Sequence, residues 1–163
     1  MKLSFICHGN IARSQILHRY VADYADRASL DLDLFSCGTA PMEFYPAADH
    51  LLAEVQAELN KRGLKESVKR DVLDEASLQH LLNSDYILVA DGKRRAEVLA
   101  RLGDPAQAQK VMLFYQFIGE GQKDFVDTFD ADKGAQDPER FARCFDELAR
   151  IAKRIVERIK TAP

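Results

Sequence analysis

Residues 7–14 combine the side chains that thiol-based phosphate chemistry requires. Cys7 supplies a thiol, and Arg13 and Ser14 close the segment. A cysteine attacks as its thiolate, which a helix N-terminus and a nearby guanidinium both favour. Backbone N–H groups of a tight loop bind phosphate oxygens, and a planar guanidinium binds two oxygens at once. We therefore predict that Cys7 is a nucleophile and that Arg13 grips the phosphate in the transition state. The residues expected to contact the phosphate are His8, Gly9, Asn10, Ile11, Ala12 and Ser14.

The spacing of Cys7 and Arg13 does not identify a site by itself, because Cys144 and Arg150 are equally far apart. The second pair falls within the last predicted helix, where an apolar stripe makes Cys144 a core residue and Arg150 a solvated one. Cys7 lies instead between a strand-like run and a helical pattern. Gly9 and Asn10 permit a tight turn there, and Ser14 can donate a hydrogen bond to the thiolate. The setting of Cys7 therefore carries the prediction.

Strand-like and helix-like periodicities alternate along the chain. The predicted strands cover residues 2–7, 32–37, 86–90 and 111–117. The predicted helices cover residues 12–28, 47–61, 74–82, 93–102 and 138–160, and residues 118–136 are expected to form a long loop. This alternation predicts a parallel sheet with helices on both faces. Ligands of such folds bind at the carboxyl ends of strands, and residues 7–14, Asp91 and the long loop all follow predicted strands.

The composition is that of an ordinary globular protein, and its 163 residues are expected to form a single domain, 1–163. The net charge of −3 gives no general attraction to nucleic acid or membranes. Three cysteines without metal-ligand spacing make a disulfide framework and a zinc site unexpected, and no cofactor is implied. Since no apolar run reaches the ~18 residues of a membrane span, and the apolar start is too short for a secretory signal, we expect a cytoplasmic protein.

The pattern C-x-G-N-x-x-R-S at residues 7–14 resembles the low-molecular-weight protein tyrosine phosphatase family. Residues 36–39, Ser-Cys-Gly-Thr, are similar to that family's Ser-Ala-Gly-Thr strand end, and residues 85–91 to its Asp-Tyr-Ile-Leu-x-Met-Asp segment. The resemblance spans nearly the whole chain. It implies a flavodoxin-like three-layer sandwich with a four-stranded parallel sheet in the order 2-1-3-4. It also implies hydrolysis of phosphotyrosine in proteins, and of small aryl phosphates, through a phosphocysteine on Cys7, and a loop that accepts a phosphate or sulfate ion.

The general acid that protonates the leaving oxygen is harder to place. The family carries it in an Asp-Pro-Tyr motif before the last helix, which this chain lacks. Asp137-Pro138 is typical of a helix start, with Asp137 as N-cap and Pro138 in the first turn. Residues 125–129, Phe-Val-Asp-Thr-Phe, are most similar to the family's apolar-Pro-Asp-Pro-aromatic run, which implies Asp127 as the acid. The other candidates are Asp124, Asp130 and Asp132.

Specificity is expected to come from the mouth of the pocket. An aromatic ring there can stack on a substrate ring, and the candidates are Phe44, Tyr45 and Phe129. The aliphatic Ile11 resembles tyrosine phosphatases of the family, whereas the related arginine phosphatases tend to carry Thr. Lys69-Arg70 is interpreted as a solvated charge pair or as a basic rim for acidic phosphopeptides.

Three alternatives to a tyrosine phosphatase stay open at this point. A phosphate-binding module without turnover would keep Cys7 and Arg13 but lack a working acid. An arginine phosphatase would use the same loop on another substrate. An arsenate reductase on the same fold would need two further cysteines, and residues 85–91, where relatives carry them, have none.

Overall fold

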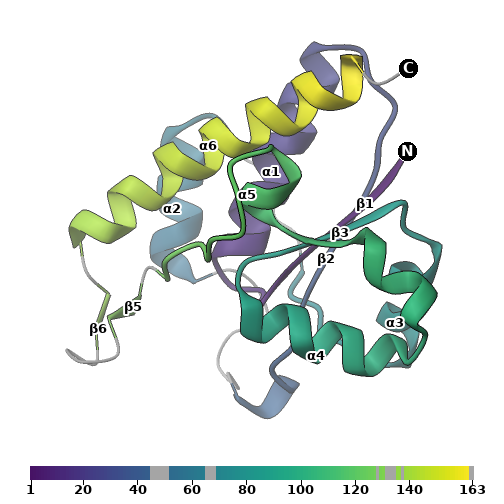
Figure 1. Cartoon of the computed structure of the whole chain (residues 1–163). Coiled ribbons are helices and arrows are strands. Elements are labelled where there is room, and N and C mark those ends of the chain that lie inside the picture. Colours follow the sequence, from purple (N-terminus) through teal and green to yellow (C-terminus); the bar gives the residue numbers. More distant parts are fainter. Residues whose placement is uncertain (45–51, 65–68, 128, 131–134, 137, 162–163) are drawn as a thin grey trace.

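The computed structural model describes residues 1–44, 52–64, 69–127, 129–130, 135–136 and 138–161 (Figure 1). Its strands are β1 (Lys2–Cys7), β2 (Asp33–Gly38), β3 (Tyr86–Val89), β4 (Val111–Leu113), β5 (Phe129–Asp130) and β6 (Ala135–Gln136). Its α-helices are α1 (Arg13–Arg27), α2 (Ala53–Lys61), α3 (Glu75–Asn83), α4 (Gly92–Leu102), α5 (Phe114–Phe117) and α6 (Pro138–Thr161). Short 3-10 turns cover Met42–Phe44 and Pro105–Lys110. No helix of the described residues is long and apolar enough to cross a membrane.

The central sheet has four parallel strands in the order β2-β1-β3-β4, which confirms the predicted topology. Helices α1, α2, α5 and α6 cover one face, and α3 and α4 cover the other (Figure 1). Successive side chains of a strand point to opposite faces, so Leu3, Phe5 and Cys7 enter the core under α1 and α6 while Ile6 enters the opposite core. The sheet is buried on both faces, and this explains why the sequences of its strands are nearly continuous runs of apolar residues.

The sequence explains two of the helices near the site: α6 by its apolar stripe and α4 by the residues at its two ends. In α6, an apolar stripe with helical spacing, including Cys144, Leu148 and Ile151, is buried against the same core as α1. Helix α4 starts where Asp91 accepts a hydrogen bond from the Arg94 N–H, and it ends at Gly103 in the left-handed conformation. Because β3 ends at Val89 and Asp91 caps the helix that follows, Asp91 lies at the carboxyl end of β3, as the alternating pattern predicts.

The prediction of a strand over residues 111–117 is wrong in its second half. Strand β4 ends at Leu113, and Phe114–Phe117 form the helical turn α5. Phe114 and Phe117 are both buried, and only a helix brings residues three apart to one face. The side chain of Gln116 also accepts a hydrogen bond from the Leu113 N–H, which stabilises the turn.

Two other predictions need adjustment. The predicted loop 118–136 contains a short antiparallel pair formed by β5 and β6. The helix predicted over 47–61 is observed as α2 from Ala53, and residues 47–51 lie outside the described part of the chain.

Candidate active site

The predicted phosphate loop connects β1 to α1, so Cys7 ends a strand and Arg13 begins a helix. Asn10 has a φ of 53°, a left-handed conformation that asparagine tolerates better than most residues. The loop also lies directly against Gly38 at the end of β2. A Cβ at Gly38 would stand 2.6 Å from the His8 carbonyl oxygen and 2.8 Å from the Asn10 nitrogen. Glycine at position 38 is therefore required by the close approach of the loop backbone.

Hydrogen bonds converge on the sulfur of Cys7. The Ser14 hydroxyl lies 3.0 Å from Sγ, and the Asn10 backbone N–H donates to Sγ over 3.3 Å. The direction of the Ser14 bond follows from its neighbours. The Asp71 N–H donates to Oδ1 of Asn10, so Nδ2 of Asn10 must be the atom that donates to the Ser14 oxygen. When Cys7 is a thiolate it has no proton to give, so the Ser14 hydroxyl is the donor to Sγ in that state.

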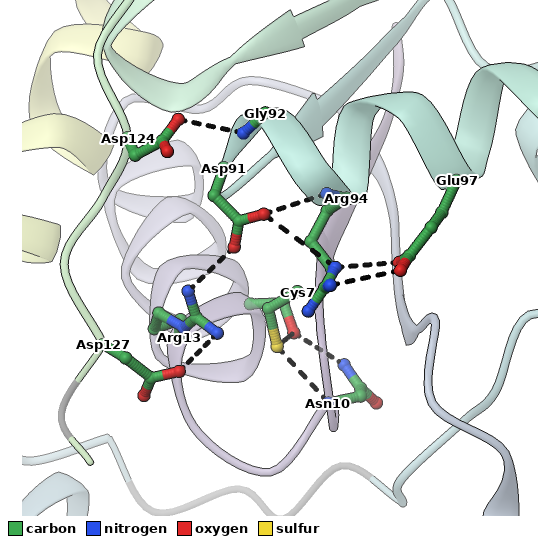
Figure 2. A network of polar contacts seen from close by, with 10 residues as sticks. Cys7, Asn10, Arg13, Asp91, Gly92, Arg94, Glu97, Asp124 and Asp127 are labelled. Atoms are coloured by element: carbon green, nitrogen blue, oxygen red, sulfur yellow. Dashed lines mark hydrogen bonds and ion pairs between the residues drawn. The ribbon is translucent and has the colours of Figure 1, made fainter. Parts of the chain in front are cut away.

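Arg13 lies between two carboxylates (Figure 2). Its Nη1 is 3.2 Å from Oδ2 of Asp91, and its Nη2 is 2.6 Å from Oδ2 of Asp127. The Arg13 side chain is buried. Burial by itself lowers the pKa of Arg13, but the charges of Cys7, Asp127 and Asp91 outweigh that effect and raise the pKa. Arg13 thus stays a cation beside the thiol.

Among the described candidates for the acid, only Asp127 reaches the phosphate loop. Its side chain is 46% exposed and contacts the guanidinium of Arg13. Asp124 lies elsewhere, because its Oδ1 accepts a hydrogen bond from the Gly92 N–H at the start of α4 (Figure 2). The side chain of Asp130 and all of Asp132 and Asp137 lie outside the described part of the chain.

The remaining predicted loop residues are placed as follows. Gly9 contributes its carbonyl oxygen to a contact with Arg70. Ile11 and Ala12 belong to the loop and are buried. His8 is half-buried; desolvation first, and the nearby charge of Arg94 next, lower the pKa of His8. The side chains of Phe44 and Phe129 and the whole of Tyr45 lie outside the described residues, so their stacking role stays a prediction.

Two residues of the site were missed by the sequence reasoning. Asp91 was noted only as a strand end, yet it both caps α4 and holds Arg13. Arg70 was interpreted as a rim or solvated residue, and that interpretation is wrong. It is only 1% exposed, and its Nε donates to the Gly9 carbonyl oxygen over 2.8 Å. A partner 61 positions away leaves no local signal in the sequence.

The other two cysteines are structural. Burial raises the pKa of Cys37 well above its ordinary value and raises that of Cys144 to about 12. Cys37 belongs to the core on the opposite face of the sheet from Cys7. Within the described residues, no cluster of three or more His, Cys, Asp or Glu side chains forms a metal-binding group.

Solved structures with similar folds span this chain from end to end. A low molecular weight phosphotyrosine phosphatase from Vibrio cholerae O395 is 17% identical, with 99% of this chain and 97% of that chain covered and a TM-score of 0.81. The YwlE arginine phosphatase from Geobacillus stearothermophilus is 18% identical, with 98% and 93% covered and a TM-score of 0.77. At these identities the likeness establishes the fold.

Sequence comparison establishes the family. Curated protein sequences give no significant match. The family model described as "Low molecular weight phosphotyrosine protein phosphatase" matches residues 2–162, which is almost the entire chain. The chain therefore belongs to the low molecular weight phosphotyrosine protein phosphatase family.

Proposed function

We propose that this protein hydrolyses phosphotyrosine, and small aryl phosphates, through a phosphocysteine intermediate on Cys7. The observation that carries the proposal is the environment of the Cys7 sulfur. It lies beside the first turn of α1, makes hydrogen bonds with the Ser14 hydroxyl and the Asn10 N–H, and has the buried cation Arg13 next to it. A thiolate and a phosphate dianion both need this combination of donors and positive charge.

The first chemical step would transfer the phosphoryl group to sulfur. The Cys7 thiolate attacks phosphorus, the bond from phosphorus to the tyrosine oxygen breaks, and a carboxylic acid at Asp127 gives its proton to that oxygen. Arg13 holds two non-bridging oxygens, where negative charge is spread in the transition state. The contact between Asp127 and Arg13 supports this role, since it places the carboxyl group beside the cation that grips the phosphate.

The second step would release phosphate. Asp127, now a carboxylate, takes a proton from water, the water oxygen attacks phosphorus, and the bond from phosphorus to sulfur breaks. The Ser14 hydroxyl lies 3.0 Å from Sγ and stabilises the departing thiolate, because a thiolate can only accept this hydrogen bond. The thiolate and the protonated acid are then restored for the next cycle.

Tyrosine is preferred over arginine as the phosphorylated residue because of Ile11. This side chain belongs to the loop and is apolar, as in the tyrosine phosphatases that the loop motif resembles. An arginine phosphatase with the same fold is among the similar structures, so both substrate classes need to be compared directly.

The test measures hydrolysis of p-nitrophenyl phosphate, a phosphotyrosine peptide and a phosphoarginine peptide. We expect the phosphotyrosine peptide to be the better peptide substrate. Asp127→Ala should lower kcat by about 10²-fold, the usual contribution of a general acid. Asp124→Ala is the matched control, because this nearby carboxylate binds Gly92 instead of Arg13, and it should retain most of the activity.

Other outcomes would contradict the proposal in identifiable ways. A 10²-fold loss of kcat in Asp130→Ala or Asp132→Ala, with Asp127→Ala unaffected, would assign the role of general acid to that residue instead. Faster hydrolysis of the phosphoarginine peptide would favour the arginine phosphatase. Phosphate binding without any turnover would favour the non-catalytic module.

A further inference from the structure

Arg70 places a buried guanidinium directly behind the phosphate loop. Besides the bond from Nε to the Gly9 carbonyl oxygen, Nη1 donates to the Met42 carbonyl oxygen and Nη2 to that of Pro41, each over 3.1 Å. A cation this deeply buried is costly unless its N–H groups have hydrogen-bond partners. Backbone carbonyls from two loops meet that need, so Arg70 binds loop backbone from the side away from the solvent.

The geometry of one peptide group connects Arg70 to the nucleophile. The carbonyl of Gly9 and the N–H of Asn10 belong to the same planar, trans peptide and therefore point in opposite directions. Arg70 binds the carbonyl oxygen at 2.8 Å, and the N–H at the other end donates to Sγ of Cys7. Holding the oxygen on Arg70 thus aims the N–H at the sulfur.

The same peptide needs support because its backbone conformation is unusual. Asn10 has a positive φ, which costs energy in a residue other than glycine. Its Oδ1 accepts hydrogen bonds from the Asp71 N–H at 2.9 Å and from Nε2 of Gln15 at 3.1 Å. Arg70 and Asp71 are neighbours in sequence, so one short segment of the chain holds both the carbonyl oxygen before Asn10 and the side chain of Asn10.

We propose that Arg70 is a positioning residue that acts on the Cys7 thiolate through the Gly9–Asn10 peptide. The proposal rests on the function proposed above, in which Cys7 is the nucleophile. It differs from a purely structural role for Arg70 in one respect. Only the Nε donor, and not the Nη contacts to residues 41–42, should affect the ionisation of Cys7.

Two substitutions separate these contacts. In Arg70→Gln, Nε2 is bonded to Cδ as Nε is in arginine, so the donor to Gly9 is kept while the Nη contacts are lost. Arg70→Met has similar length and no donor. Arg62→Met is the control, because Arg62 is bound to Glu58 and Asp146 in a different part of the molecule.

The measurement is the rate of alkylation of Cys7 by iodoacetamide as a function of pH, followed by mass spectrometry, with circular dichroism to verify folding. The midpoint of this profile should rise by about one pH unit in Arg70→Met, since a hydrogen bond to a charged group changes such an equilibrium about tenfold. It should stay near the wild-type value in Arg70→Gln and Arg62→Met. At neutral pH, kcat/KM should fall about tenfold in Arg70→Met only.

Equal shifts in Arg70→Met and Arg70→Gln would overturn the proposal, as would no shift in a folded Arg70→Met protein. If Arg70→Met does not fold, Arg70→Leu, which also lacks a donor, takes its place with the same expected rise. A rise of a full unit in Arg70→Gln, or no rise in folded Arg70→Leu, overturns the proposal. Alkylation requires no turnover. Failure of phosphatase activity would therefore contradict the proposed function while leaving this test of Arg70 intact.

Discussion

The environments of the three thiols divide the cysteines into one reactive and two structural residues. Cys7 receives hydrogen bonds from Ser14 and from the Asn10 N–H, both of which stabilise negative charge on sulfur. Cys37 and Cys144 lie in apolar cores, and burial raises the pKa of each thiol. All three thiols are buried, so the difference is set by the hydrogen-bond donors around the sulfur, not by the position of an arginine six residues later.

This difference predicts selective labelling of the folded protein. A thiol whose pKa is raised to about 12, as in Cys144, stays protonated at pH 8 and reacts slowly, and the same sign applies to Cys37. Iodoacetamide at pH 8 should therefore label Cys7 alone, as measured by peptide mass spectrometry. Cys7→Ser should take up no label until a denaturant is added. Rapid labelling of Cys37 or Cys144 in the native protein would contradict these assignments.

The residue types around Cys7 predicted the phosphate loop itself better than the residue that supports it from another part of the chain. Gly9, Asn10 and Ser14 have loop and hydrogen-bonding properties that can be read from the sequence around Cys7. The structure places Gly9 and Asn10 in the loop and Ser14 in the first turn of α1. Arg70 could not be assigned in this way. Its contact with Gly9 joins residues 61 positions apart in the sequence, which is a tertiary property.

At the scale of elements, helix α4 is coupled to the phosphate loop by a single carboxylate. Oδ1 of Asp91 accepts the Arg94 N–H at the start of α4, and Oδ2 contacts Nη1 of Arg13. The carboxylate therefore stabilises the helix and orients the arginine at once. Asp74 caps α3 through the Ser77 N–H in the same way but lies outside the phosphate loop.

Asp91→Ala should consequently destabilise the protein more than Asp74→Ala, and only Asp91→Ala should impair catalysis. Asp74→Ala loses an N-cap alone, whereas Asp91→Ala loses an N-cap and the ion pair with the buried Arg13, and urea unfolding measures both effects. Only Asp91→Ala should also lower kcat/KM, by about tenfold, because Arg13 loses a charged partner. Equal activity losses in the two variants, or full activity in Asp91→Ala, would show that Asp91 does not orient Arg13.

Element boundaries were predicted where local signals are strong. Strand β1 and the start of α6 at Pro138 match the sequence pattern. The pattern failed after Leu113, where an apolar run suits either a strand or a helix. Burial of both Phe114 and Phe117 in the core under α6 decides for the helix, and that burial depends on the assembled sheet.

At the scale of the whole molecule, the parallel sheet collects the site from distant parts of the chain. The loop after β1 and Asp91 after β3 meet at the carboxyl ends of neighbouring strands, as such sheets generally arrange their ligand sites. Asp127 arrives from the long segment that follows α5. The alternating pattern predicts this edge, but the contact of Asp127 with Arg13 depends on the path of that segment and could not be predicted.

The central claim is that phosphate passes through the sulfur of Cys7, and trapping the intermediate tests it most directly. Wild-type protein mixed with p-nitrophenyl phosphate is quenched in acid within the first turnover and digested for mass spectrometry. We predict one phosphate on the peptide that contains Cys7, and neither the adduct nor hydrolysis in Cys7→Ala. Undiminished hydrolysis by Cys7→Ala, or wild-type turnover with phosphate on another residue, would contradict the account.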